Sequence, residues 1–179
     1  LKQRSLGQYA TLAAAAFGAV AYVVVEDLGK ELDRVQRISR RAAGELERSD
    51  QYGEFAREID LQRAADPLET VRRINAELFD RLTYSPKSTR VDSPIDDALE
   101  SRKGVCQDFT HIMIALVRQL GIPCRYVSGY LFHQPDGDVR SPDGSTHAWG
   151  EVWLPDLGWV GFDPTNNLVA DHRHIRVAV

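Results

Sequence analysis

The most constraining feature of this chain is an apolar helix followed at once by strand-like sequence. Over residues 106–120 the large apolar side chains recur every three or four positions, which is the period of a helix with one wide buried face. Those side chains are Phe109, Ile112, Met113, Leu116, Val117 and Leu120. Gly121 and Pro123 then end the helix. Such a helix must cover its apolar face with a second layer of structure.

The residues after this helix supply the second layer. Residues 124–132, CRYVSGYLF, are typical of a strand, and a loop rich in glycine and aspartate follows at residues 133–145. Two aromatic-rich strands, residues 146–155 and 159–165, are joined by PDLG, which is a hairpin signal. Helices that precede an antiparallel sheet predict an α+β fold, with the helix of residues 106–120 packed on the sheet.

Two further helices are expected before this core. Asp66 and Pro67 form a good helix start, an N-cap carboxylate followed by proline in the first turn, and the apolar stripe continues to Leu82. Residues 83–94 have the composition of a loop, with two prolines and several hydroxyl groups. A short helix is expected at residues 96–101.

The first third of the chain is mostly helical by pattern. Residues 31–48 form an amphipathic helix pattern, and residues 52–63 a weaker one. Residues 9–25 are apolar, but they fall short of the roughly 20 apolar residues of a membrane-spanning helix, so a buried helix is favoured over a weak anchor. We therefore expect a helical N-terminal segment, residues 1–62, that is the remnant of a longer chain, and a second domain, residues 63–179.

Charge and cysteine content exclude several classes of protein. The 179 residues carry a net charge of −4, and no basic block stands out, which argues against a nucleic-acid partner. Two cysteines do not make a disulfide framework. A reducing compartment, the cytoplasm, is the simplest expectation, with no membrane partner. The oligomeric state is not set by any feature of the sequence.

Cys106 lies where a cysteine can be reactive. It opens the helix of residues 106–120, two residues after Gly104, which allows a sharp turn. A helix N-terminus carries unpaired N–H groups and the positive end of the helix dipole, so it stabilises a thiolate. The same N–H groups can hold an oxyanion during acyl transfer. The alternative is a structural cysteine that starts a core helix, and this stretch alone does not decide between the two.

A nucleophilic cysteine needs a base and a group that orients the base. Among five histidines, His147 stands out because it opens a strand, and the next strand brings Asp163 in FDPT. The other histidines are less suited. His111 is expected to point away from the N-terminus of the helix, and His133 lies beside a loop. His172 and His174 have the pattern of exposed polar residues, and the sequence supplies no further ligands for a metal site there. For His147 the alternative is a core histidine, and for Asp163 it is a turn former before proline.

The hairpin register decides whether the two side chains can meet. Strand alternation puts His147, Trp149, Glu151 and Trp153 on one face. If Trp153 lies opposite Trp159, with the turn centred on residues 155–157, then Asp163 shares that face and is a diagonal neighbour of His147. A register one residue different would turn the carboxylate to the other face.

Three stretches together resemble a known family. GVCQDF, GIPCRYVSGYL and THAWGEVWLPDLGWVGFDPT resemble the transglutaminase-like superfamily, particularly its bacterial branch, over about residues 66–179. The resemblance implies a papain-like arrangement in which Cys106 is the nucleophile, His147 the base and Asp163 the orienting carboxylate. It also implies acyl transfer or hydrolysis at peptide or amide bonds through a thioester, with no metal or organic cofactor. The calcium dependence of animal transglutaminases has no matching region here.

Four other residues are candidates for substrate binding or the oxyanion site. Trp149 and Trp159 are candidates for the walls of an acyl channel, with core aromatics as the alternative. Tyr84 and Gln107 are candidate oxyanion donors, and a loop anchor is the alternative for Tyr84.

The expected partners are a peptide or protein substrate and, in place of water, an amine acceptor. Two other functions stay open. One is a noncatalytic binding module that keeps the same fold. The other is an arylamine acyltransferase-like enzyme, which uses the same three residues.

Overall fold

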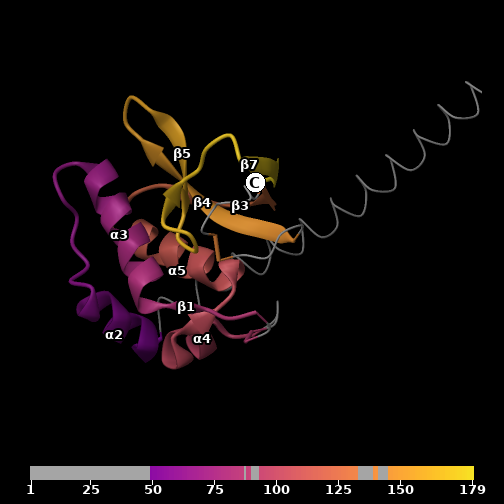
Figure 1. The fold of residues 1–179 in the computed structure, drawn as a ribbon. Helices are drawn as coiled ribbons and strands as arrows, with labels where there is room; N and C mark the ends of the chain where they lie inside the picture. Colours follow the sequence, from indigo (N-terminus) through magenta and orange to yellow (C-terminus); the bar gives the residue numbers. More distant parts are fainter. Residues whose placement is uncertain (1–48, 87, 90–92, 133–138, 141–144) are drawn as a thin grey trace, which may run out of the picture. The chain divides into compact units, whose positions relative to one another are not determined.

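The computed structural model describes residues 49–86, 88–89, 93–132, 139–140 and 145–179 (Figure 1). These residues belong to one compact unit. The helix expected at residues 31–48 and the apolar stretch at residues 9–25 lie outside the described residues. Within the described ranges, no helix is both long and apolar enough to cross a membrane.

In the part of the chain that the structure describes, four helices precede the sheet: α2 (Asp50–Glu58), α3 (Pro67–Arg81), α4 (Ile95–Ser101) and α5 (Cys106–Gln119). Helix α3 begins where the sequence predicts it, because the Asp66 side chain accepts a hydrogen bond from the Leu68 N–H at 2.8 Å. In α2, which is shorter than the predicted stretch, the N-cap is Ser49.

The sheet has five strands in the order β6-β5-β4-β3-β7, and every neighbouring pair is antiparallel. Three strands were expected: β3 (Cys124–Leu131), β4 (Thr146–Leu154) and β5 (Gly158–Asp163). The edge strands β6 (Leu168–Val169) and β7 (His174–Ala178) were not. The α+β prediction is confirmed.

A second, very short sheet lies in the expected loop region. Strand β1 (Thr83–Tyr84) pairs in parallel with β2 (Lys103–Gly104), and Tyr84 lies opposite Gly104. The loop prediction for residues 83–94 is therefore wrong at its first two residues. The pairing brings Tyr84 beside the turn that leads into α5.

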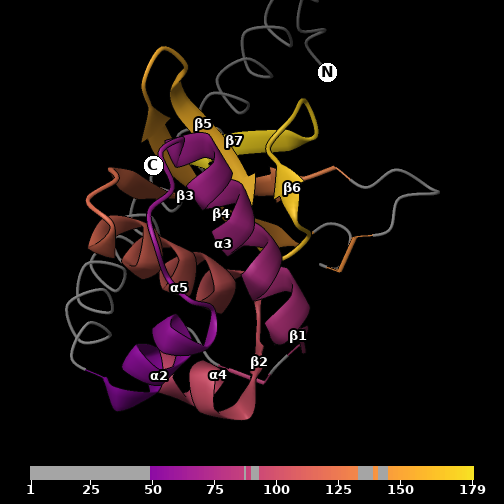
Figure 2. The ribbon, with the colours of Figure 1, turned by 90° about the vertical axis from the view of Figure 1, so that its left-hand side faces the viewer.

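Helix α5 is the centre of the core. It lies against β3 and β4 of the sheet and also against α3 and α4 (Figure 2). Its residues from Asp108 to Val117 are all buried. A helix buried on all sides is apolar on all sides, which explains the wide stripe seen in the sequence. At the contact with β4, a side chain on Gly150 would lie 3.5 Å from the Met113 sulfur.

The β4–β5 hairpin has the predicted register. Trp153 pairs with Trp159, Leu154 pairs with Gly158, and the turn covers residues 155–157. Gly150 faces α5, so strand alternation turns His147 and its neighbours at every second position to the opposite face of the sheet. Asp163 lies on that face as well.

Candidate active site

Cys106 is the first residue of α5 and is partly exposed. The turn before it is held by Asp108, whose carboxylate accepts hydrogen bonds from the Val105 N–H at 2.8 Å and from the Thr89 hydroxyl. A Cβ at Gly104 would lie 2.9 Å from Asp108, so glycine is required for this close approach. The buried carboxylate therefore fixes the turn that presents the Cys106 sulfur at the positive end of the helix dipole.

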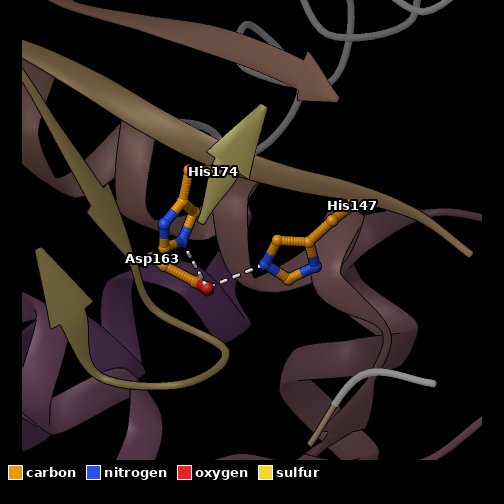
Figure 3. Close-up of side chains that lie close together, drawn as sticks. All are labelled: His147, Asp163 and His174. Carbon is orange, nitrogen blue, oxygen red and sulfur yellow. Dashed lines mark hydrogen bonds and ion pairs between the residues drawn. The ribbon is translucent and has the colours of Figure 1, made fainter. Parts of the chain in front are cut away.

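His147 and Asp163 form a buried pair. His147 Nε2 lies 2.7 Å from Asp163 Oδ2, and both side chains are excluded from solvent (Figure 3). The other ring nitrogen, Nδ1, is also buried and makes no hydrogen bond of standard geometry with the described residues. Burial lowers the pKa of His147, and the Cys106 sulfur, after Asp163, is one of the two groups that raise it. Since Nε2 is directed at Asp163, Nδ1 is the atom left for the sulfur.

The electrostatics of this pair favour a charged imidazole. Burial by itself lowers the pKa of His147, but hydrogen bonds and charge from Asp163 and Cys106 outweigh burial and raise that pKa above its ordinary value of 6.5. Burial by itself raises the pKa of Asp163, but hydrogen bonds from His147, His174 and Asn166 lower it below its ordinary value of 3.8. At neutral pH the pair is therefore an imidazolium beside a carboxylate.

Asp163 is fixed by its own turn as well. Its Oδ1 accepts hydrogen bonds from the Thr165 N–H at 3.0 Å and the Asn166 N–H at 3.3 Å, and its Oδ2 accepts one from Asn166 Nδ2 at 2.7 Å. A carboxylate that caps the residues after it is the turn-forming role considered as the alternative for Asp163. The structure shows that one side chain both shapes this turn and pairs with His147.

His174 lies at this site, which the sequence pattern did not indicate. Its side chain is buried, and its Nε2 lies 3.3 Å from Oδ2 of Asp163, the same oxygen that pairs with His147. The expectation that His174 is exposed is therefore wrong, because β7 folds back along β3 and brings it inward. His172, two residues earlier, is exposed as expected.

His147, Asp163 and His174 also have the residue types of a metal site. Their candidate ligand atoms lie within 4.8 Å of one another. Asp163 Oδ2, however, already accepts a hydrogen bond from Asn166 as well as facing both imidazoles. A cation would have to displace these hydrogen-bonding protons, so the cluster is satisfied as a hydrogen-bonded unit.

The two candidate oxyanion donors lie near Cys106 in the chain or in space. Tyr84 is half-buried and pairs with Gly104, and burial together with the charge of Cys106 raises the pKa of its hydroxyl. Gln107 follows Cys106 in the first turn of α5 and is half-buried.

The two candidate tryptophans are not equivalent. Trp149 is buried, and its ring centroid lies 6.2 Å from that of His147, so it forms a wall behind the imidazole. Trp159 is 39% exposed, packs edge-on against Trp153, and lies under the Arg125 guanidinium at 4.0 Å. The contacts described for Trp159 are therefore in the hairpin and not with His147.

Sequence reasoning missed Asn166, Tyr126 and the packing of His111. Tyr126 is buried on β3, and burial, then the charges of Cys106 and Asp108, raise the pKa of its hydroxyl. His111 stacks on Tyr126 with ring centroids 5.0 Å apart, and burial lowers its pKa to about 4. Only Asn166 had a usable signal, because an asparagine three residues after a turn-forming aspartate can reach back to its carboxylate.

The order of these elements defines a class of site. A cysteine at the start of a core helix, a histidine on a neighbouring strand and an aspartate on the next strand form the papain-like arrangement. The sequence model of the transglutaminase-like superfamily matches residues 53–164, and the chain belongs to this superfamily of cysteine-dependent enzymes. The match begins ten residues before the domain boundary expected at residue 63.

The chain is also similar to individual proteins of two bacteria. Over 100 residues the chain is 43% identical to Uncharacterized protein ML0607 of Mycobacterium leprae. The aligned region is 55% of this chain and 35% of that protein. Over 103 residues it is 34% identical to a protein-glutamine gamma-glutamyltransferase of Pseudomonas aeruginosa. The aligned region is 53% of this chain and 14% of that protein. The chain thus spans about a third, or less, of the length of these relatives.

A solved structure shows the same fold. It is described as a "Putative Cysteine Protease from Cytophaga hutchinsonii", and it matches 71% of this chain and 40% of that chain with a TM-score of 0.55 at 29% identity. A structure described as "a TGase" matches 65% of this chain and 31% of that chain with a TM-score of 0.51 at 17% identity, which is a likeness of fold alone.

Proposed function

We propose that this protein catalyses acyl transfer from peptide or amide substrates through a thioester on Cys106, with His147 as the base and Asp163 as the orienting carboxylate. The observation that carries the proposal is the buried pair of His147 and Asp163, whose second imidazole nitrogen is left for the sulfur at the start of α5. A structural histidine has no need of an ionised buried partner on one side and a thiol on the other.

The reaction follows from this geometry. The Cys106 thiolate attacks the carbonyl carbon of an amide, and the carbonyl oxygen becomes an oxyanion. We expect N–H groups of the first turn of α5 to stabilise that oxyanion, with the Tyr84 hydroxyl and the Gln107 amide as further candidates. The His147 imidazolium gives its proton to the amide nitrogen, the C–N bond breaks, and an amine leaves.

The second half of the reaction releases the acyl group. Water or a primary amine attacks the thioester, neutral His147 takes the proton of the attacking group, and the C–S bond breaks. Water gives a carboxylic acid and an amine gives a new amide, and Cys106 returns as the thiolate in both cases. Asp163 keeps the Nε2 proton of His147 in place, so that Nδ1 stays directed at the sulfur.

The relatives support amide chemistry but differ in what accepts the acyl group. One is named as a glutamyltransferase and another as a cysteine protease. We therefore keep glutamine-containing peptides as the first substrates to test and compare water and an amine as acceptors.

The test uses a library of glutamine-containing peptides with and without a fluorescent primary amine. Mass spectrometry of the products should show either the deamidated or cleaved peptide, or the amine-linked peptide. The Cys106→Ala and His147→Ala variants should form no product, whereas Cys124→Ala, at a buried thiol, should retain turnover if it folds. Turnover by Cys106→Ala at the wild-type rate would reject the proposal and favour a noncatalytic role for this cysteine.

A further inference from the structure

We infer that His174 is a positioning residue for the proposed reaction: its Nε2–H donates to Asp163 and holds the carboxylate that orients His147. The inference rests on the proposed function and adds a fourth side chain to it. His174 lies ten residues beyond the end of the family match at residue 164, so it comes from a segment that the match does not cover.

The first argument is where β7 places the imidazole. His174 is the first residue of β7 and pairs with Leu131 at the end of β3. Gly129 on β3 makes the close approach possible, because a Cβ there would lie 2.1 Å from the carbonyl oxygen of Ile175. A bulge between Ser128 and Gly129 shifts the pairing at the same point. The backbone of β7 is therefore brought close enough for His174 to reach Asp163.

The second argument is the tautomer. The backbone N–H of Asp171 donates to His174 Nδ1 at 3.2 Å, whereas Oδ1 of Asp171, which already accepts from two N–H groups of Arg173, lies farther from Nδ1 at 3.4 Å. The shorter contact makes Nδ1 of the neutral ring the acceptor. The ring proton is then on Nε2, which lies 3.3 Å from Asp163 Oδ2. An ionised carboxylate oxygen only accepts hydrogen bonds, so Nε2 must be the donor. The Asp171 carboxylate is held by Arg173 at 2.8 Å. The turn thus sets His174 as a donor to Asp163.

The third argument is convergence on one oxygen. Figure 3 shows the imidazoles of His147 and His174 directed at the same carboxylate oxygen of Asp163. The Trp149 ring packs near both of them, with its centroid 6.2 Å from His147 and 5.2 Å from His174 in an edge-on arrangement. A carboxylate held in this way cannot rotate to follow His147 or withdraw from it, and the imidazole keeps one orientation.

The consequence is chemical as well as geometric. Each donor to Asp163 stabilises the ionised carboxylate, which is buried. An ionised Asp163 accepts the Nε2 proton of His147 in a hydrogen bond without taking it, which is what an orienting carboxylate must do. If His174 were only a packing residue, any side chain of similar size would serve.

The test compares two amides that differ in reach. In His174→Gln the amide nitrogen can occupy the place of Nε2 and donate to Asp163. In His174→Asn the amide reaches only about as far as Nδ1, so it can keep the contact with Asp171 but not the one with Asp163. The matched control is His172→Gln, which makes the same change at an exposed histidine two residues away.

We expect His174→Asn to lower kcat roughly ten- to a hundredfold with KM nearly unchanged, because a small loss of alignment at a reacting group is costly. His174→Gln should recover most of the wild-type kcat, and His172→Gln should match the wild type. Equal rates in all variants, or an equal loss in the Asn and Gln variants at position 174, would overturn the inference.

A measurement on the wild-type protein decides the hydrogen bond independently of activity. NMR of protein labelled with 15N-histidine reports which ring nitrogen carries the proton, and we expect the proton of neutral His174 on Nε2. A proton on Nδ1 with a bare Nε2 would overturn the inference. If the wild-type protein shows the expected proton position but none of the tested substrates acylates it, the result counts against the proposed function and not against the role of His174. The two measurements therefore separate failure of the inference from failure of the proposed function.

Discussion

Replacing Asp163 with asparagine changes one atom at the centre of the site and has a calculable effect. Asp163 Oδ2 faces His147, Asn166 and His174, and its Oδ1 accepts the N–H groups of Thr165 and Asn166. An asparagine offers only one oxygen and puts an NH₂ group in the place of the other. In either orientation of the amide, its NH₂ group faces hydrogen-bond donors that accept no hydrogen bond from it.

The two orientations of the new amide have different consequences. If its oxygen replaces Oδ2, the NH₂ group faces the N–H groups of Thr165 and Asn166, and two unsatisfied buried donors cost roughly 2–6 kcal/mol of stability. If its oxygen replaces Oδ1, the NH₂ group faces His147 Nε2, which must then give up its proton, so the imidazolium becomes a neutral ring protonated on Nδ1. In that state Nδ1 cannot take the proton of the Cys106 thiol and the thiolate is not formed, so we expect acylation to fall by a factor of about 10³–10⁴.

The assay measures acylation with the peptide found in the library experiment, together with thermal unfolding. Asp156→Asn is the matched control, because Asp156 is exposed in the hairpin turn with φ 64°, a conformation that asparagine tolerates. It should leave both quantities unchanged. An Asp163→Asn variant whose acylation rate is within about threefold of wild type would refute the orienting role. A His147 ring that is neutral and protonated on Nδ1 cannot accept the Cys106 proton, so it cannot support a fast reaction.

Three further outcomes follow from the same structure. Iodoacetamide at pH 7 should modify partly exposed Cys106 and spare Cys124, because burial raises the pKa of the Cys124 thiol to about 12; equal labelling in the folded protein would contradict this. Gly129→Ala should lower the free energy of unfolding by about 1–3 kcal/mol or more, because the new Cβ would lie 2.1 Å from a backbone oxygen. Gly53→Ala should raise the free energy of unfolding by about 0.5–1 kcal/mol, because Gly53 lies in a helix with open space around it. Urea melts measure both changes. The pKa of His147 is raised on folding, so its contribution to stability is complete below about pH 6.5 and is lost as the pH rises towards about 10; a His147→Gln variant should lack this slope in urea melts.

The hairpin was predictable because its constraints are local. The turn at residues 155–157 and the cross-strand pair of Trp153 and Trp159 set the register, and alternation then places His147 and Asp163 on one face. The start of α3 was predictable for the same reason, since Asp66 and Pro67 act on the first turn that follows them. Local chemistry was sufficient for the part of the site formed by β4 and β5.

The position of His174 was not predictable because it depends on non-local pairing. Strand β7 meets β3 across some forty residues of chain, through a bulge next to Gly129. A five-residue strand with exposed side chains at Ile175, Arg176 and Val177 has no buried face that alternation could reveal. The two-residue strand at Tyr84 was missed for a similar reason, since its partner lies at Gly104 and is equally short.

The most direct test of the central claim is to trap the covalent intermediate. The enzyme is mixed with an activated acyl donor, quenched in acid within one turnover and digested with trypsin, which separates the two cysteines by cutting after Arg118. We expect an added mass equal to the acyl group on the peptide that contains Cys106, formed rapidly by the wild type and lost in His147→Ala. An acyl group found on Cys124 or on another residue, or product formed at the wild-type rate with Cys106 never acylated, would contradict it.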